Sequence, residues 1–439
     1  MAKICRNARR AILAVILFPI AACDLFDVTN PTTIEEDDVA NPDGAELARR
    51  NAVAYLYAFV SEAARTSALR SDEVFFFPSL TTVQTGAVTT DMLLDLRIND
   101  LNRGANTNLT YQWANNVRKA ASFAISLYLK YGADWQRADL GQVLAIKGMG
   151  TAGLADYICL GFALHDYADG GPVYAKPASS TVEVYERALE DLDSAVVYAA
   201  QNERVLSLAR VARGRILLAL GRFEEAARAV AEVPTTFTYL TEFTGAGAFR
   251  NGFLFSFSST GNNLSVSDRE GGNGLDFVSA GDPRVQVRRL GTAWDGVTDL
   301  YAPLKYQSLR DPIVIASGIE ARLIEAEAQL NGATPGDWLA TLNALRATQI
   351  DPPLPPLTDP GTPDARLDLL FRERAFWLFL TGRRLPDLRR LVDVYKRDPE
   401  RVFPTGTNPG GLTYERGMGI AFSPTGEQYA GTGVTGCVD

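Results

Sequence analysis

Residues 367–391 read LDLLFRERAFWLFLTGRRLPDLRRL. The apolar positions recur at helical rather than alternating spacing, namely at Leu367, Leu370, Phe371, Phe376, Leu378 and Phe379. Gly382 is placed to end this helix in a left-handed cap, and Pro386 followed by Asp387 suits the first turn of a second helix. The stretch carries six arginines but is too rich in Leu, Phe and Trp to lie exposed. We therefore expect two helices at a core edge, with guanidinium groups that fix surrounding loops or carboxylates.

The bulk composition is that of a globular protein. The chain has 439 residues, of which 46% are hydrophobic and 22% charged. Its formal net charge of −9 argues against nucleic acid as a partner, because phosphate binding needs a basic surface. After the N-terminus, no apolar stretch is long enough to span a bilayer as a helix.

The N-terminus has the features of an export signal. Four basic residues between Lys3 and Arg10 precede a short apolar segment at 11–20. Cys23 then follows two alanines, which resembles a bacterial lipobox, where the chain is cut before a lipid-modified cysteine. We expect residues 1–22 to be a lipoprotein signal peptide and residues 23–44 to be a lipid-anchored, acidic tether. The alternative is an ordinary secretory signal in which Cys23 is incidental.

The remaining cysteines allow one disulfide. Cys5 leaves with the signal and Cys23 takes the lipid, so Cys159 and Cys437 remain. An exported protein reaches an oxidising compartment, where these two can pair. Two unpaired thiols are the equally open alternative.

Most of the chain has helical periodicity. Strong helix candidates cover residues 46–65, 111–131 and 140–161. The third contains Gly148-Met149-Gly150-Thr151-Ala152-Gly153, which matches the dinucleotide-binding pattern G-x-G-x-x-G. That pattern requires a preceding strand, whereas here it lies within one continuous helical stripe. We therefore interpret its small residues as sites of close helix packing and expect no cofactor.

Two helical hairpins indicate the fold class. Residues 206–233 match a tetratricopeptide-like unit with its turn at 220–223, and residues 319–345 are a second candidate. Such units stack into a scaffold with a concave face. We predict a mainly α protein, built on a tetratricopeptide-like helical hairpin scaffold with a long irregular loop and small β excursions. Thr181 is the expected N-cap of a further helix that precedes the first hairpin.

The long loop is the expected carrier of function. Residues 234–317 are rich in Gly, Asn, Ser, Thr and aromatics, and the alternation at Phe253, Phe255 and Phe257 suits a short strand. A shorter irregular stretch begins at Ser71. Aromatic rings from both can stack on sugar rings or grip peptide side chains, with polar neighbours to orient the ligand. The candidate ligand-binding residues are Phe75, Phe76, Arg97, Asn99, Trp294, Tyr301 and Tyr306, although most such aromatics in proteins belong to the core.

The sequence does not point to an enzyme. His165 is the single histidine, and the common hydrolase and P-loop motifs are absent from the sequence. Asp72 and Glu73 are neighbouring carboxylates, but glycosidase carboxylates are defined by their separation in space. We expect no catalytic residues, no cofactor and no metal site.

Several segments, in order along the chain, resemble the SusD/RagB family of nutrient-binding lipoproteins. They are the NP-containing segment after Cys23, TVEVYERALEDLDSAV, LKYQSLRDPIVIASGIEARLIEAEAQL, NALRA and the final ER…GRR…DLRR block. The resemblance implies that residues 45–439 form one SusD/RagB-like helical domain, with the loop insertion at about 234–317. Trp377 and Thr381-Gly382 depart from the family's pattern in the final block.

The resemblance also implies a function. Family members are lipid-anchored, surface-exposed proteins of the outer membrane that capture glycans or peptides for a TonB-dependent, SusC-like transporter. We therefore expect a substrate-binding lipoprotein with a glycan or peptide ligand and that transporter as its partner. The alternative is an envelope-anchored helical-repeat scaffold that binds only proteins.

Overall fold

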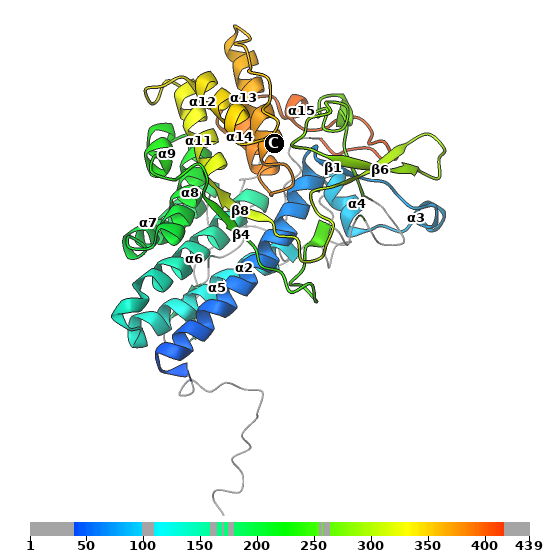
Figure 1. Cartoon of the computed structure of the whole chain (residues 1–439). Helices are drawn as coiled ribbons and strands as arrows, with labels where there is room; N and C mark the ends of the chain where they lie inside the picture. The colour runs from blue at the N-terminus through cyan, green and yellow to red at the C-terminus, as the bar shows by residue number, and fades with distance from the viewer. Residues whose placement is uncertain are drawn as a thin grey trace, which may run out of the picture.

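The protein is mainly helical, as the sequence predicted (Figure 1). The computed structural model describes residues 39–98, 109–158, 164, 166–168, 171–173, 180–253, 257 and 264–416. Within these residues the strands form four two-stranded antiparallel sheets. None of the helices described there is both long and apolar enough to cross a bilayer.

A long first helix runs through the molecule. Helix α2 (Pro42–Arg70) packs beside α5 (Leu109–Tyr131) and α6 (Arg137–Tyr157), with the short η2 (Asp134–Gln136) before α6 (Figure 1). Helix α2 begins where Asn41 accepts a hydrogen bond from the Gly44 amide at 2.9 Å. Pro42, which has no amide hydrogen to donate, occupies the first helical position.

The glycines of α6 serve packing, as predicted. The whole G-x-G-x-x-G pattern lies inside this helix. A Cβ atom on Gly148 would lie 2.8 Å from Leu192 of α7 (Thr181–Tyr198), and one on Gly153 would lie 2.3 Å from the Phe59 ring of α2. Glycine at these positions therefore lets α6 approach its neighbours closely.

The predicted hairpins are present. They are α8 (Glu203–Ala219) with α9 (Phe223–Val230), and α11 (Gly318–Leu330) with α12 (Trp338–Thr348). One detail differs, because the N-cap of α7 is Ser180 rather than Thr181. The Ser180 hydroxyl accepts a hydrogen bond from the Glu183 amide at 3.1 Å.

The long insertion leaves and rejoins the helical scaffold at one place. Strand β4 (Thr238–Leu240) pairs with β8 (Val314–Ser317), so Thr238 faces Ser317. Between them, β5 (Leu264–Val266) pairs with β1 (Val74–Phe76), and β6 (Val287–Thr292) forms a hairpin with β7 (Asp299–Pro303). The expected strand at 253–257 is wrong at both of its described ends, since Phe253 and Phe257 are helical.

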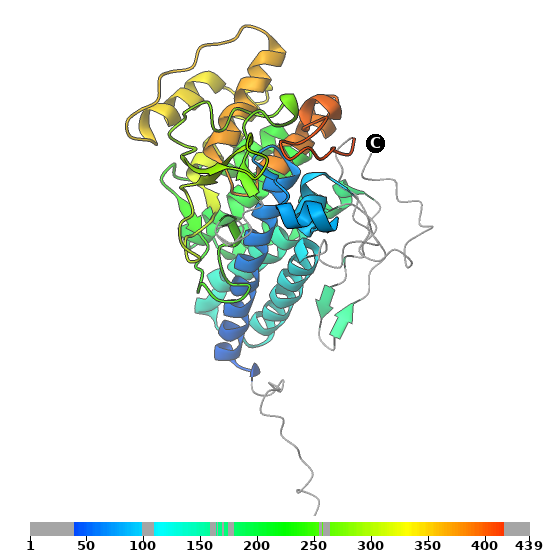
Figure 2. The same ribbon diagram turned by 90° about the vertical axis from the view of Figure 1, so that its right-hand side faces the viewer.

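Shorter elements complete the fold. They are α3 (Leu80–Thr85), α4 (Thr90–Asp95), the pair β2 (Asp166–Ala168) and β3 (Gly171–Val173), η3 (Glu270–Gly272) and α15 (Pro399–Val402). In the turned view, the segment after α15 lies beside the α3–α4 region, although the two are far apart in sequence (Figure 2). The main chain confirms this contact, because the Glu415 amide donates to the Leu96 carbonyl at 3.0 Å.

The C-terminal block forms two helices, α13 (Pro363–Trp377) and α14 (Arg384–Asp393). Pro386 lies in the first turn of α14, as predicted. Helix α13, however, ends at Trp377, before Gly382. A turn with two left-handed residues, Leu380 and Gly382, joins the helices. Gly382 suits this turn because a Cβ atom there would lie 3.2 Å from the Ala64 backbone and from the Tyr157 hydroxyl.

The six arginines of the block reach several different elements. Arg374 pairs with Asp387, and Arg390 pairs with both Asp387 and Glu327 of α11, at 2.7–2.9 Å. Arg384 makes two hydrogen bonds of 2.6 and 2.8 Å to Asp72, and Arg372 pairs with Asp276 in the insertion. The prediction that guanidinium groups fix the surrounding carboxylates is confirmed.

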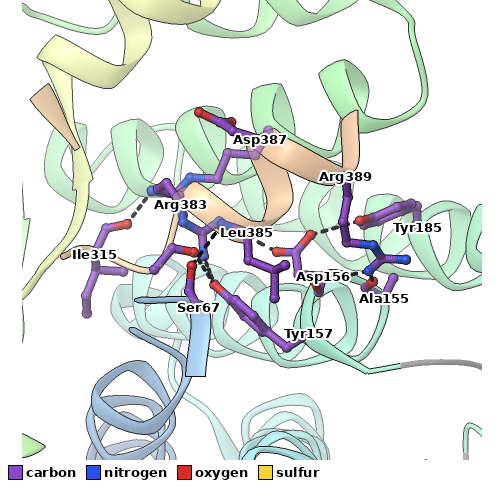
Figure 3. Close-up of polar contacts among 12 residues, drawn as sticks. Ser67, Ala155, Asp156, Tyr157, Tyr185, Ile315, Arg383, Leu385, Asp387 and Arg389 are labelled. Atoms are coloured by element: carbon purple, nitrogen blue, oxygen red, sulfur yellow. Dashed lines mark hydrogen bonds and ion pairs between the residues drawn. The ribbon is translucent and has the colours of Figure 1, made fainter. Parts of the chain in front are cut away.

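The other two arginines hold the end of α6 (Figure 3). Arg389 donates to the carbonyls of Ala155 and Asp156, which lie at the end of that helix. Arg383 hydrogen-bonds the Tyr157 hydroxyl and lies 3.6 Å from the Asp156 carboxylate. The Tyr157 hydroxyl donates in turn to the Gly382 carbonyl at 2.7 Å. The end of α6 is thereby joined to the turn between α13 and α14.

We expect Glu327→Gln to reduce the free energy of unfolding by about 3–5 kcal/mol, because it leaves buried arginines without their counter-charge. Glu327 is fully buried and pairs with Arg390, with Arg374 3.7 Å away. Urea denaturation followed by circular dichroism measures this change. The matched control is Asp359→Asn, which breaks the exposed pair with Arg366 and should leave the stability unchanged. Equal effects of the two substitutions would contradict the assigned role of Glu327.

Glu73 should make the stability depend on pH. Burial raises the pKa of this carboxyl from 4.5 to about 8, although the Leu380 amide donates to it at 2.8 Å. The folded state therefore holds a proton that the unfolded state releases, so the contribution of Glu73 is fully present below pH about 4.5 and is lost as the pH rises to about 8.

We expect the urea midpoint of the wild-type protein to fall over this range more steeply than that of Glu73→Gln, which keeps an acceptor for Leu380. Parallel pH profiles of the two proteins would contradict this assignment.

Candidate functional site

The tip of the β6–β7 hairpin presents an exposed indole. Its turn is organised by Asp295, whose carboxylate accepts hydrogen bonds from the Val297 and Thr298 amides at 2.9 Å and from the Thr298 hydroxyl at 2.7 Å. These bonds lower the pKa of Asp295 and keep it ionised. Gly296 has a φ of +72°, which this tight turn requires. Trp294 projects from the turn with 49% of its surface exposed.

The indole is fixed by the segment that follows α2, residues 71–98, which we call the first loop. Its Nε1 donates to the Pro78 carbonyl at 2.7 Å, and its ring centroid lies 5.9 Å from that of Phe77. On the same hairpin, the Thr298 hydroxyl lies 3.3 Å from the Pro409 carbonyl oxygen. We call the group Phe77, Pro78, Trp294, Thr298 and Pro409 the Trp294 surface.

A segment near the C-terminus supports this surface. Residues 403–415, which we call the strap, run past the first loop. Asn408 of the strap donates to the Phe76 carbonyl and to the Asp95 carboxylate, both at 2.9 Å. A Cβ atom on Gly410 would lie 2.7 Å from Pro78, so the strap passes close to that residue. The Trp294 surface is thus built from three distant parts of the chain.

The structure separates the predicted ligand residues into two groups. Trp294 is exposed, and Tyr301 of β7 is partly buried on the same hairpin. Asn99 lies outside the described residues, as do Cys23, Cys159, Cys437 and His165. Nothing in the structure therefore bears on the predicted lipidation or disulfide.

The other four predicted ligand residues are buried, which corrects their assignment as ligand contacts. Phe75 and Phe76 lie in β1, where the backbone pairs with β5. Arg97 is 1% exposed and donates to the carbonyls of Pro404 and Glu415 in the strap. The Tyr306 hydroxyl donates to the Leu380 carbonyl at 2.9 Å, in the turn between α13 and α14. These side chains hold loops together and offer no surface to a ligand.

The carboxylates of Asp72 and Glu73 are also structural. Asp72 forms an ion pair with Arg384 and accepts a hydrogen bond from the Leu275 amide at 2.8 Å. Glu73 is fully buried against the turn at Leu380. Neither side chain faces an open cleft. Within the described residues, no group of three or more His, Cys, Asp or Glu side chains is arranged to hold a metal ion.

Two grooves lined largely by helices were not predicted from the sequence. A groove of about 530 Å³ between α7 and α14 is lined by Tyr185, Glu186, Arg222, Arg389 and Lys396 among others. A second, of about 390 Å³, lies between α2, α8 and β4 and is lined by Tyr57, Gln142, Arg204 and Tyr239 among others. A smaller cavity of about 50 Å³ adjoins Tyr157 and Arg383, near the contacts in Figure 3. Their linings come from elements that are separate in sequence, so no local sequence signal marks them.

Comparison with known proteins identifies the fold. No protein-family model matches the sequence, and no curated protein is a detectable relative. Solved structures do match. A SusD superfamily protein from Bacteroides thetaiotaomicron is 14% identical, with 80% of this chain and 89% of that one covered and a TM-score of 0.62.

Two further structures are those of carbohydrate-binding proteins. A SusD-like carbohydrate binding protein from Bacteroides vulgatus is 16% identical, with 80% of this chain and 83% of that one covered and a TM-score of 0.61. Surface glycan-binding protein A from Bacteroides thetaiotaomicron, in complex with laminarihexaose, is 12% identical, with 88% and 98% covered and a TM-score of 0.58. The chain has the fold of the SusD superfamily, as its sequence resemblance implied.

Proposed function

We propose that this protein binds glycans through the Trp294 surface at the outside of the cell. The observation that carries the proposal is an indole that is half exposed yet fixed by a hydrogen bond and a ring contact. A sugar ring offers an apolar face that can stack on an exposed aromatic ring. Because the ring is already held, little conformational entropy is lost on binding.

The fold supports the same proposal. Among the structures that share it are those of a SusD-like carbohydrate binding protein and of surface glycan-binding protein A in complex with laminarihexaose. Peptide capture remains an outcome of the binding test, because an indole also accepts apolar side chains.

We further propose that the protein is a lipoprotein of the outer membrane that delivers its ligand to a TonB-dependent, SusC-like transporter. Support comes from Cys23 after the apolar N-terminal segment and from the ordered resemblance to SusD/RagB proteins. A role as a scaffold that binds only proteins would show as transporter-independent protein capture without glycan binding.

We expect Trp294→Ala to weaken glycan binding by about tenfold, because it removes one aromatic stacking contact. Isothermal titration calorimetry against neutral oligosaccharides, beginning with laminarihexaose, and against peptide pools measures the affinity. Trp135→Ala is the matched control, since Trp135 is 77% exposed but lies in η2, at the turn between α5 and α6. Equal losses in the two variants, or none in Trp294→Ala, would place the ligand elsewhere, with the two grooves as the next sites to test.

Cys23→Ser should abolish fatty-acid labelling of the protein and move it from the membrane fraction to the soluble fraction. The reason is that the thiol is the only group at this position that can carry the lipid. Labelling with a radioactive fatty acid, followed by fractionation, measures both effects. A variant that keeps its label and its membrane association would show that the chain is anchored in another way.

A further inference from the structure

The strap is held to the first loop and the insertion by one buried polar cluster. Asp95, at the end of α4, is fully buried and accepts hydrogen bonds from the Phe76 amide at 3.0 Å and from Asn408 of the strap at 2.9 Å. Glu270, in the insertion, is 2% exposed and accepts hydrogen bonds from Ser267 at 2.5 Å and from the Tyr414 hydroxyl of the strap. Each carboxyl group therefore holds the strap at a different residue.

Arg97 is the cation of this cluster. Its guanidinium group lies 4.9 Å from the ring centroid of Tyr414 and 5.6 Å from that of Phe403. It donates to the Pro404 carbonyl at 2.5 Å and to the Glu415 carbonyl at 3.0 Å. Its backbone has a φ of +58°, a left-handed conformation that costs free energy for a residue other than glycine. The contacts with the strap must offset that cost.

Burial favours a proton shared between the two carboxyl groups of the cluster. Asp95 and Glu270 interact directly, and both are shielded from water. Two adjacent buried carboxylates cannot both be ionised without a large desolvation penalty, and Arg97 compensates for one negative charge. One shared proton leaves one carboxylate and one carboxylic acid beside the Arg97 guanidinium group.

We propose that Asp95, Glu270 and Arg97 are positioning residues of the Trp294 surface, and that this surface is held only while the two carboxyl groups carry one proton between them. Loss of that proton places a second negative charge in the cluster. Water must then enter, and the element that can lift to admit it is the strap. Asn408 and Pro409 move with the strap, so Phe76, Pro78 and Thr298 lose their support and the indole loses its fixed orientation.

Other charged groups face the cluster from every side. They are Asp72, Glu400, the phenol of Tyr414 and the buried guanidinium group of Arg70, which lies at the end of α2 and faces Arg97, with Arg384 already paired to Asp72. Asp72 adds a negative charge near Glu270 and so favours retention of the proton. In agreement with the geometry, burial raises the pKa of Asp95 to about 7 and that of Glu270 well above its ordinary value. Loss of the proton therefore requires a pH above the ordinary range of a carboxyl group.

The test measures the fluorescence emission of Trp294 in the absence of ligand. Full-length protein is titrated from about pH 5 to about pH 9, and the fluorescence of Trp294 is obtained by subtracting a parallel titration of Trp294→Phe. We expect a red shift of the Trp294 emission as the pH rises. Asp95→Asn keeps acceptors for Phe76 and Asn408 but needs no proton, so it should remove the shift. Glu270→Gln, which replaces the other carboxyl group of the pair, should also remove the shift. It provides a second variant if Asp95→Asn fails to fold.

Glu73→Gln is the matched control, because it removes another buried titratable carboxyl, one that accepts a hydrogen bond from Leu380 and not from the strap. Its Trp294 titration should follow that of the wild-type protein. An emission that stays constant with pH in the wild-type protein would overturn the proposal, as would shifts in Asp95→Asn and Glu270→Gln that match the wild type.

The inference rests on the proposed function only in its consequence for ligands, namely that glycan affinity falls along with the emission change. A pH-dependent shift that the two variants remove, in a protein that binds no glycan, would support the positioning role and reject glycan binding.

Discussion

Ion pairs buried in the C-terminal block are the interaction on which the rest of the structure depends. A guanidinium group removed from water is tolerated only where carboxylates or carbonyls replace its hydration shell. In α13, α14 and the turn between them, each of six arginines finds such a partner on another segment or on a neighbouring helix. Because the partners are spread over the turn between α2 and β1, α6, α11 and the insertion, these segments must all be in place before the charges are satisfied. The block therefore ties the helical scaffold to the loops that it carries.

Buried polar contacts also connect the helical scaffold to the candidate ligand surface. Arg384 binds Asp72, which precedes β1, and Tyr306 of the insertion binds the turn after α13. The first loop and the insertion are thus attached to the same pair of helices at separate points. A ligand at Trp294 would meet a surface whose orientation is set by the helical core rather than by the hairpin alone.

Sequence reasoning worked where the signal was local and periodic. The helices, the two hairpins and the packing role of the α6 glycines follow from spacing along one element. The arginine-rich helices were also predictable, because so many cations amid Leu, Phe and Trp require buried partners. Which carboxylates serve as those partners was not, since Asp72 and Glu327 are remote from the block in sequence. The turn after α13 was misjudged because Leu380, not only a glycine, adopts a left-handed backbone, held by Glu73 and Tyr306.

The candidate site was the least predictable part. Phe75, Phe76, Tyr306 and Trp294 all belong to irregular aromatic-rich segments, and residue type alone does not tell which ring faces the core. Three of them are buried by strand pairing or by a hydrogen bond to a distant carbonyl, whereas Trp294 stands on a turn that Asp295 fixes. Arg97 was chosen for its polarity, but its partners lie in the strap, a segment that carries no recognisable motif.

The position of the strap has a consequence for how a newly made chain matures. Residues 403–415 are synthesised long after the first loop that they support, and the insertion comes in between. The helical hairpins can pack as soon as their residues are available, but the loop around Phe76 and Asp95 must wait for Asn408. A chain that is interrupted after α14 would therefore contain nearly the whole helical scaffold and yet display no finished Trp294 surface. If the Trp294 surface binds the ligand as proposed, ligand recognition would then be acquired only after residues 403–415 have been synthesised.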